Sequence, residues 1–199
     1  MVKIGINGFG RIGRLILRAL LENYKGKIQV VGINDLGSIE TNAHLIKYDS
    51  THGILNQDVK TTSDGFKIGD QNIKVFAEKD PSKLPWGKIG ADVVLECTGF
   101  FLDKTSAGKH IQAGAKKVII SAPAKEVDFT LVQGVNSKEL KKEHNIISNG
   151  SCTTNCLAPV AMVLEKNFGI TYGYMTTIHS YTGDQKLLDT LHKDLRRAR

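Results

Sequence analysis

The sequence predicts an α/β protein built on a mostly parallel, doubly wound sheet. Short apolar segments of strand length alternate with segments of helical periodicity from Val2 to Ser148. The first two strands, Val2–Ile6 and Ile28–Ile33, enclose one helical segment. Two parallel strands joined by a helix connect through a right-handed crossover, and repetition of that unit generates a doubly wound sheet.

The composition is that of an ordinary globular protein. Of the 199 residues, 41% are hydrophobic and 24% are charged, which is enough to bury a core without disulfides or metals. The formal charge of +7 comes from scattered lysines and one cluster, Arg196, Arg197 and Arg199, with no zinc-finger spacing and no basic aromatic strand. We therefore interpret the charge as solvated surface and do not expect a nucleic-acid partner.

The N-terminus and the cysteines indicate a cytoplasmic location. The chain opens directly into an apolar strand, without a signal-peptide pattern or an apolar run long enough to cross a bilayer, so we expect no membrane contact. Cys97, Cys152 and Cys156 are too few and too unevenly spaced for a disulfide framework or a zinc site. We expect reduced thiols and no bound metal.

The elements around and after the second strand follow from local patterns. Apolar residues at helical spacing predict the first helix over Gly10–Tyr24. Two short alternating runs, Gly65–Ile68 and Asn72–Phe76, predict a hairpin that extends the sheet with antiparallel strands. The remaining elements of this part are, in order, a strand over Ala91–Cys97, a helix over Thr105–Ala113, and strands over Lys117–Ser121, Phe129–Gly134 and Asn145–Ser148.

The character of the chain changes after Ser148. The segment Cys152–Asn167 has the apolar periodicity of one helix, and the Thr- and Tyr-rich segment Ile170–Ser180 is typical of a half-exposed antiparallel strand. We place a domain boundary near Asn149–Ser151, which gives domains over residues 1–150 and 151–199. A second domain of roughly 50 residues is too small for its own core, so we expect the chain to be incomplete.

Gly8, Gly10 and Gly13 form a G-x-G-x-x-G motif between the first strand and the first helix. That context identifies a dinucleotide site and predicts a Rossmann-type fold. The first glycine permits the tight turn, the second lets the backbone approach a pyrophosphate, and the third lets helix and strand pack closely. The helix N-terminus adds unpaired N–H groups and a partial positive charge.

Asp35 ends the second strand, at the spacing expected for the acid that binds the adenine ribose hydroxyls. Its carboxylate would repel a 2′-phosphate, which favours NAD over NADP as the cofactor. The alternative is that Asp35 only caps the turn before Gly37.

A second group of candidate residues surrounds Cys152. This cysteine falls at a predicted helix start, where the helix dipole and free N–H groups stabilise a thiolate. Ser151 and Thr153 beside it offer hydroxyl donors to an anionic substrate. His179, far along the chain, is a candidate to activate the thiol and to shuttle a proton, although sequence distance does not establish contact. A cysteine at a helix start is often inert, and that alternative stays open.

Three segments of the chain carry a family resemblance. They are Ile6–Gly13, Ser148–Pro159 and Thr177–Thr182, with the sequences INGFGRIG, SNGSCTTNCLAP and TIHSYT. Together they resemble the phosphorylating glyceraldehyde-3-phosphate dehydrogenases, and the resemblance runs from Val2 to Arg199. It implies an NAD-binding Rossmann domain over residues 1–150. Over residues 151–199 it implies the beginning of an α+β catalytic domain, with a nucleophile helix, a His-bearing strand and the start of an intersubunit loop.

The resemblance also implies residue roles by position. Cys152 would attack the aldehyde of glyceraldehyde 3-phosphate, and His179 would raise its thiolate character and act as acid and base. Hydride would pass to NAD, and inorganic phosphate would cleave the resulting thioester to 1,3-bisphosphoglycerate. The implied substrate contacts are Ser151, Thr153 and Thr182, and the implied cofactor contacts are Gly8, Gly10, Arg11, Ile12, Gly13, Asp35, Lys79 and Ser121. Lys79 stands where the family often has Arg.

The family resemblance implies a glycolytic oxidoreductase that works as a cytoplasmic homotetramer, and it leaves alternatives open. Erythrose-4-phosphate dehydrogenase shares the cysteine motif. A chain that binds NAD without catalysis is the second alternative, because part of the family's substrate site lies beyond Arg199. RNA binding across the nucleotide pocket is a weaker third. Thr190 and Leu191 precede His192 where NAD-specific members often carry Leu-Pro, which loosens the argument for strict NAD use.

Overall fold

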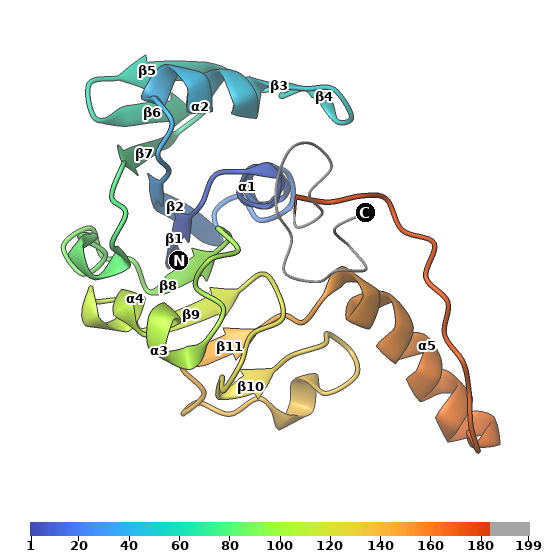
Figure 1. Cartoon of the computed structure of the whole chain (residues 1–199). Coiled ribbons are helices and arrows are strands. Elements are labelled where there is room, and N and C mark those ends of the chain that lie inside the picture. Colours follow the sequence, from blue (N-terminus) through green and yellow to red (C-terminus); the bar gives the residue numbers. More distant parts are fainter. Residues whose placement is uncertain (184–199) are drawn as a thin grey trace, which may run out of the picture. The chain divides into compact units, whose positions relative to one another are not determined.

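The computed structural model describes residues 1–183. The chain divides into two compact units, one spanning Met1–Met162 and the other beginning at Val163. Within the described residues, the first unit holds a mostly parallel nine-stranded sheet with helices (Figure 1), which confirms the predicted fold class.

The elements have the following bounds. The strands are β1 (Val2–Asn7), β2 (Ile28–Asn34), β3 (Tyr48–Asp49), β4 (Gly53–Ile54), β5 (Val59–Thr62), β6 (Gly65–Ile68), β7 (Gln71–Phe76), β8 (Val93–Glu96), β9 (Lys117–Ile120), β10 (Phe129–Thr130) and β11 (Ile146–Ser148). The helices are α1 (Arg11–Asn23), α2 (Ile39–Lys47), α3 (Lys104–Ala107), α4 (Lys109–Gln112) and α5 (Cys152–Phe168), with short 3₁₀ turns at Pro81–Lys83 and Ser137–Glu139.

β1 lies in the sheet at the point where the strand order reverses. It pairs in parallel with β2 on one side and with β8 on the other, in the full order β10-β11-β9-β8-β1-β2-β7-β6-β5. β7 is parallel to β2, whereas β6 and β5 are antiparallel additions at that edge. Ligands of doubly wound sheets bind beyond the carboxyl ends of the strands at such a reversal. A site is therefore expected beyond Asn7, Asn34 and Glu96, which end β1, β2 and β8.

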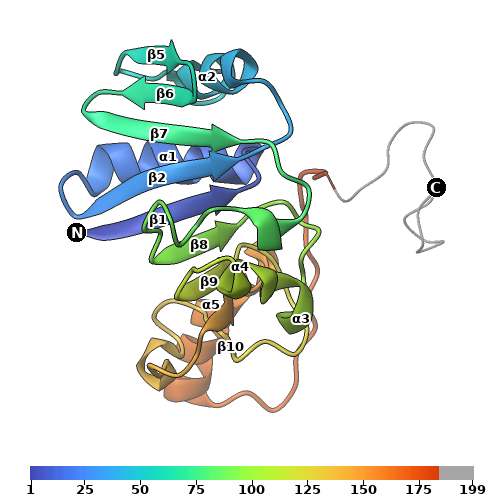
Figure 2. The same cartoon turned by 90° about the vertical axis from the view of Figure 1, so that its left-hand side faces the viewer.

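Different helices cover the two faces of the sheet, with α1 on one face and α3 and α4 on the other (Figure 2). Ile4 and Ile6 of β1 are buried in one apolar cluster with Leu17 of α1. Gly5 between them faces the opposite side, where a Cβ atom would lie 2.6 Å from the Trp86 ring. Because successive residues of a strand point to opposite faces, β1 contributes to both cores, as expected of a central parallel strand.

The predicted elements of the first unit are confirmed, with differences mainly at their ends. β6 and β7 form the predicted antiparallel hairpin. The helix expected over Thr105–Ala113 is instead two short helices, α3 and α4, with Gly108 between them, because glycine is a weak helix former. The strand expected over Phe129–Gly134 is only the two residues of β10, and α2, β3, β4 and β5 are additional to the prediction.

The strand predicted over Ile170–Ser180 is wrong. This segment of the second unit has no regular secondary structure, and Tyr174 and Ile178 are fully exposed. A strand forms only when its backbone groups pair with a neighbour, and no described residue pairs with this segment as a β-ladder. The domain boundary near Asn149–Ser151 stays a prediction.

Candidate cofactor site and cysteine site

A cleft of about 460 Å³ lies in the first unit at the expected edge of the sheet. Residues that follow β1, β2, β7 and β8 line it, because parallel strands end at the same edge. Its lining includes Asn7, Gly8, Gly10, Asp35, Lys79 and Thr98. The volume lies within the range of about 300–1,000 Å³ that is typical of small-molecule sites.

Gly8 and Gly10 line this cleft, and the buried Gly13 packs behind them in the first turn of α1. Gly8 has a φ of +91°, and a Cβ atom there would lie 2.7 Å from the backbone nitrogen of Thr98. A Cβ atom on Gly13 would lie 2.2 Å from the carbonyl oxygen of Gly8. At Gly10, by contrast, no described atom lies within 4 Å of such a Cβ atom, and Gly10 lines the cleft. A side chain would thus clash at the first and third positions and enter open space at the second.

The N-terminus of α1 supplies hydrogen-bond donors beside the glycines. Gly10 is the N-cap and has no side chain to accept from the first turn, and the first N–H groups of a helix have no partner within it. Arg11 and Ile12 carry these groups, and both residues are exposed. The guanidinium of Arg11 is engaged in an ion pair with Asp49. The backbone of this turn is therefore suited to an anionic group such as a pyrophosphate.

Asp35 connects the glycine loop to the end of β2. Its Oδ2 accepts a hydrogen bond from the Phe9 N–H at 2.9 Å, and its Oδ1 accepts one from the Gly37 N–H at 2.9 Å. The carboxylate therefore does cap the turn before Gly37, and it also lines the cleft. Each carboxylate oxygen can accept more than one hydrogen bond, so capping the turn does not prevent it from accepting ribose hydroxyls.

Lys79 and Ser121 occupy different positions relative to the cleft. Lys79 lines the cleft, and its side chain is exposed. Ser121 follows β9, and its side chain is hydrogen-bonded to the thiol of Cys97. Burial raises the pKa of Cys97 to about 12, so the one cysteine among the lining residues is a neutral thiol at physiological pH.

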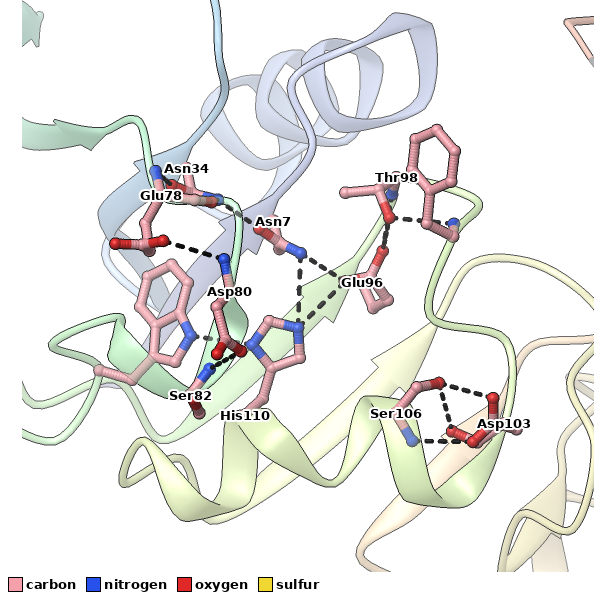
Figure 3. Close-up of polar contacts among 12 residues, drawn as sticks. Asn7, Asn34, Glu78, Asp80, Ser82, Glu96, Thr98, Asp103, Ser106 and His110 are labelled. Atoms are coloured by element: carbon pink, nitrogen blue, oxygen red, sulfur yellow. Dashed lines mark hydrogen bonds and ion pairs between the residues drawn. The ribbon is translucent and has the colours of Figure 1, made fainter.

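Sequence reasoning missed several residues that form the cleft. Asn7 and Thr98 line it, and the fully buried Glu96 beneath them accepts hydrogen bonds from both (Figure 3). The signal that could have found them is their position, because Asn7 ends β1, Glu96 ends the neighbouring β8 and Thr98 follows β8. Asn7 also directly precedes the glycine motif, whereas no motif marks Glu96 or Thr98.

Cys152 begins α5 and is exposed. The preceding Ser151 occupies the N-cap position, since its Oγ accepts a hydrogen bond from the Thr154 N–H at 2.9 Å. The dipole of α5 therefore points its positive end toward the thiol, the arrangement that stabilises a thiolate. Thr153 is half-buried, and Cys156, one turn later, is exposed.

His179 and Thr182 belong to the second unit, and both are exposed. Cys152 belongs to the first unit. The proposed pairing of the thiol with His179 and the substrate contact of Thr182 therefore stay predictions. Thr190, Leu191 and His192 lie outside the described residues, as does the basic cluster near Arg199.

Two family models match the chain. Residues 2–104 match the model described as glyceraldehyde 3-phosphate dehydrogenase, NAD binding domain, and residues 151–199 match the corresponding C-terminal domain. The chain belongs to the glyceraldehyde-3-phosphate dehydrogenase family. The first match covers the glycine motif, Asp35 and every lining residue of the cleft, so the cofactor is NAD.

Named relatives extend this similarity over the whole chain. It is 56% identical over 198 residues to a glyceraldehyde-3-phosphate dehydrogenase of Xanthobacter flavus and 57% identical over 199 residues to one of Geobacillus stearothermophilus. A third, from Pseudomonas aeruginosa, is 53% identical over 199 residues. Each alignment covers 100% of this chain, but the chain spans only about 59% or 60% of the length of these relatives.

The residues of the cleft fit a dinucleotide. Gly10 lines the cleft and leaves open the space that a Cβ atom would fill, the first turn of α1 follows it with unpaired N–H groups, and the Asp35 carboxylate lines the cleft as an acceptor. Among residues 1–183 there is no group of three or more His, Cys, Asp or Glu side chains that could hold a metal ion. No helix in that part of the chain is both long and apolar enough to cross a membrane.

Proposed function

We propose that this chain serves the NAD-dependent oxidative phosphorylation of glyceraldehyde 3-phosphate to 1,3-bisphosphoglycerate. The observation that carries the proposal is the combination of the NAD cleft with an exposed cysteine at the N-terminus of α5, in a chain of this family. The relatives that bear the name of this activity extend beyond the part that the chain aligns with.

The first unit would bind and orient the cofactor. The N–H groups of Arg11 and Ile12 would meet the pyrophosphate, and the Asp35 carboxylate would accept the adenine ribose hydroxyls. Lys79 and Ser121 are proposed as further cofactor contacts. Bound NAD would supply a hydride acceptor. An acid at position 35 disfavours a 2′-phosphate, which supports NAD over NADP.

Cys152 would act as the nucleophile of the reaction. Its thiolate, favoured by the positive end of α5, would add to the aldehyde carbon and form a hemithioacetal. Loss of the hydride leaves a thioester on the sulfur, which inorganic phosphate cleaves, so the acyl group leaves as an acyl phosphate and the thiolate is regenerated. His179 would take the hydroxyl proton of the hemithioacetal. Ser151, Thr153 and Thr182 are proposed to contact the substrate or phosphate.

The remaining proposals concern assembly, location and domains. We propose a homotetramer for the full-length protein and a cytoplasmic location, in line with a glycolytic activity. We also propose the domain boundary at residues 150 and 151, which is supported by the second family match beginning at residue 151.

The proposal is tested by NADH formation from glyceraldehyde 3-phosphate, NAD and inorganic phosphate. We expect turnover by the wild-type chain, none by Cys152→Ser, and near wild-type turnover by Cys156→Ser. The last variant is a matched control, because it removes another exposed thiol one turn along the same helix. Erythrose 4-phosphate is assayed in parallel.

Three outcomes would contradict parts of this proposal. A chain that binds NAD by calorimetry but forms no NADH is a cofactor-binding chain without catalysis. Faster turnover of erythrose 4-phosphate than of glyceraldehyde 3-phosphate would assign the sibling activity instead. Equal loss of turnover in both serine variants would show that helix packing, rather than the Cys152 thiolate, explains the effect.

A further inference from the structure

A network of buried polar side chains (Figure 3) includes and contacts residues that line the cofactor cleft. Glu96 of β8, His110 of α4 and Trp86 are all 0% exposed, and Asn7 of β1 is 1% exposed. His110 does not line the cleft, yet it contacts a residue that holds two lining residues in place. Burying a polar group is costly unless it is hydrogen-bonded. Each donor in this network therefore needs an acceptor, and this requirement identifies the donor and the acceptor of each hydrogen bond.

The Trp86 indole determines which nitrogen of His110 carries the proton. Its Nε1–H is only a donor, and it lies 2.9 Å from Nδ1 of His110. Nδ1 must therefore accept, which places the proton on Nε2 in the neutral ring. Nε2 lies 3.0 Å from Oε2 of Glu96, so His110 donates to the carboxylate.

The Glu96 carboxylate oxygens accept every hydrogen bond that they make with the described residues. Its Oε2 also accepts from Nδ2 of Asn7 at 2.6 Å, and its Oε1 accepts from the backbone N–H of Thr98 at 2.7 Å and from the Thr98 hydroxyl. This pattern is the one that an ionised carboxylate satisfies. Nδ2 of Asn7 and Nε2 of His110 are 3.5 Å apart and are both donors, so they share Glu96 rather than bonding to each other.

The network extends from Glu96 to the neighbouring strand ends. Oδ1 of Asn7 accepts from Nδ2 of Asn34 at 2.7 Å. Asn34 also exchanges two hydrogen bonds of 2.8 Å with the backbone of Glu78. The cleft is lined by Asn7, Asn34, Glu78 and Thr98, which come from four separate segments of the chain. One buried carboxylate therefore sets the relative positions of several parts of the cleft wall.

We propose that His110 is a positioning residue for dinucleotide binding. Its Nε2–H, held in that tautomer by Trp86, orients the Glu96 carboxylate so that Asn7 and Thr98 take their places on the wall of the cleft. The inference rests on the proposed cofactor role of this cleft. The proposed role depends on the hydrogen bond from Nε2 of His110 to Glu96, rather than on the volume that the imidazole ring fills.

Two amide substitutions separate the roles of the two ring nitrogens. In His110→Gln, the amide nitrogen can replace Nε2 as the donor to Glu96, while the acceptor for Trp86 is lost. In His110→Asn, the shorter amide oxygen can replace Nδ1 as the acceptor for Trp86, while Glu96 loses its donor. Both variants lose the ring and both keep one hydrogen bond, so each is the control for the other.

The measurement is the Kd of NAD for the purified chain by calorimetry, read beside the thermal midpoint of each variant. We expect about a tenfold weaker Kd for His110→Asn, the size of effect that follows from removing one hydrogen bond to a charged group. We expect His110→Gln to bind within roughly threefold of wild type, since the bond to Glu96 is retained. A role in packing alone would weaken both variants in parallel with their midpoints.

A second readout uses the wild-type chain and does not depend on the variants folding. Trp86 is the one tryptophan of the sequence, so its indole N–H gives a single assigned resonance in a proton–nitrogen NMR spectrum. Addition of ADP-ribose, which lacks the nicotinamide, is expected to shift this resonance through Thr98, Glu96 and His110.

The outcomes distinguish this inference from the proposed function. Equal Kd values for the two variants, a weaker Kd for His110→Gln than for His110→Asn, or an indole resonance that does not move at saturating ADP-ribose would overturn the role of His110 while the cofactor role stands. A wild-type chain that fails to bind NAD would overturn the cofactor role, and this inference with it.

Discussion

Replacing Gly13 by alanine separates the packing role of the glycine motif from its contact with the ligand. The added methyl group would lie 2.2 Å from the Gly8 carbonyl oxygen and 3.2 Å from the Ile6 side chain, and real Cβ contacts are essentially never shorter than 3.0 Å. Overpacking of this kind costs about 1–3 kcal/mol. Alanine recovers up to about 1 kcal/mol of that as the better helix former in the first turn of α1.

We therefore expect Gly13→Ala to lower the free energy of unfolding by about 1–2 kcal/mol. For a chain of this size each kcal/mol shifts the thermal midpoint by roughly 2–4 °C, so the midpoint should fall by about 5 °C. NAD affinity should fall as well, because the glycine loop must move away from Gly13 to relieve the contact. Thermal denaturation followed by circular dichroism measures the first effect, and calorimetry measures the second.

Gly10→Ala is the matched control. Gly10 has an ordinary φ of −71°, and no described atom lies within 4 Å of the added Cβ position. The loss of glycine at the N-cap and the reduced entropy of the unfolded chain offset each other to within about 0.5 kcal/mol. Stability should be preserved while NAD binding is lost. A Gly13→Ala chain as stable as wild type would contradict the packing role of Gly13, and a Gly10→Ala chain that binds NAD normally would contradict the ligand contact at Gly10.

Individual contacts lead to three further predictions. Asp35→Ala should weaken NAD binding by about tenfold and reduce the preference for NAD over NADP, because its carboxylate is the proposed acceptor of the adenine ribose hydroxyls. Unchanged Kd values for both dinucleotides by calorimetry would contradict this. The ion pair with Lys104 holds the pKa of Asp128 at about 2, below its ordinary value of 3.8. Its stabilisation is therefore fully present above pH 3.8 and lost as the pH falls toward 2, so the thermal midpoint of Asp128→Asn should depend less steeply on pH in that window. The raised pKa of Cys97, about 12, keeps its thiol protonated, so iodoacetamide at about pH 8 should alkylate the exposed Cys152 and leave Cys97 unmodified. Peptide mass measures the modification of each cysteine. Rapid alkylation of Cys97 would show instead that its thiol is accessible and ionises readily.

Much of the fold could be predicted because its signals are local. The apolar strands on either side of α1 are recognised from their composition, and the glycine motif is recognised from its spacing. The spacing is informative because a side chain at Gly8 or Gly13 would clash with the backbone. The segment Ile170–Ser180 could not be predicted in the same way. Its composition suits a strand, but pairing depends on a neighbour, and no described residue provides one.

The residues of the candidate site likewise differ in whether a local sequence pattern marks them. Residues with a motif around them, such as Asp35 and Cys152, can be selected from the amino-acid sequence alone. His110 cannot, because a lone histidine in a short polar helix carries no signal of its own. Its significance arises from Trp86 and Glu96, which bring a donor and an acceptor to opposite sides of one ring.

The amino-acid pattern alone predicts a dinucleotide-binding βαβ unit and a cysteine at a helix start in this chain. Both depend on residues that are near neighbours along the chain, where turn geometry and helix capping act locally. The folded chain was needed to show that the ends of β1, β2, β7 and β8 meet at one cleft and which buried groups contact its lining. Those contacts link residues as far apart as Asn7 and Glu96, and hydrogen bonds across such separations exist only once the sheet has formed.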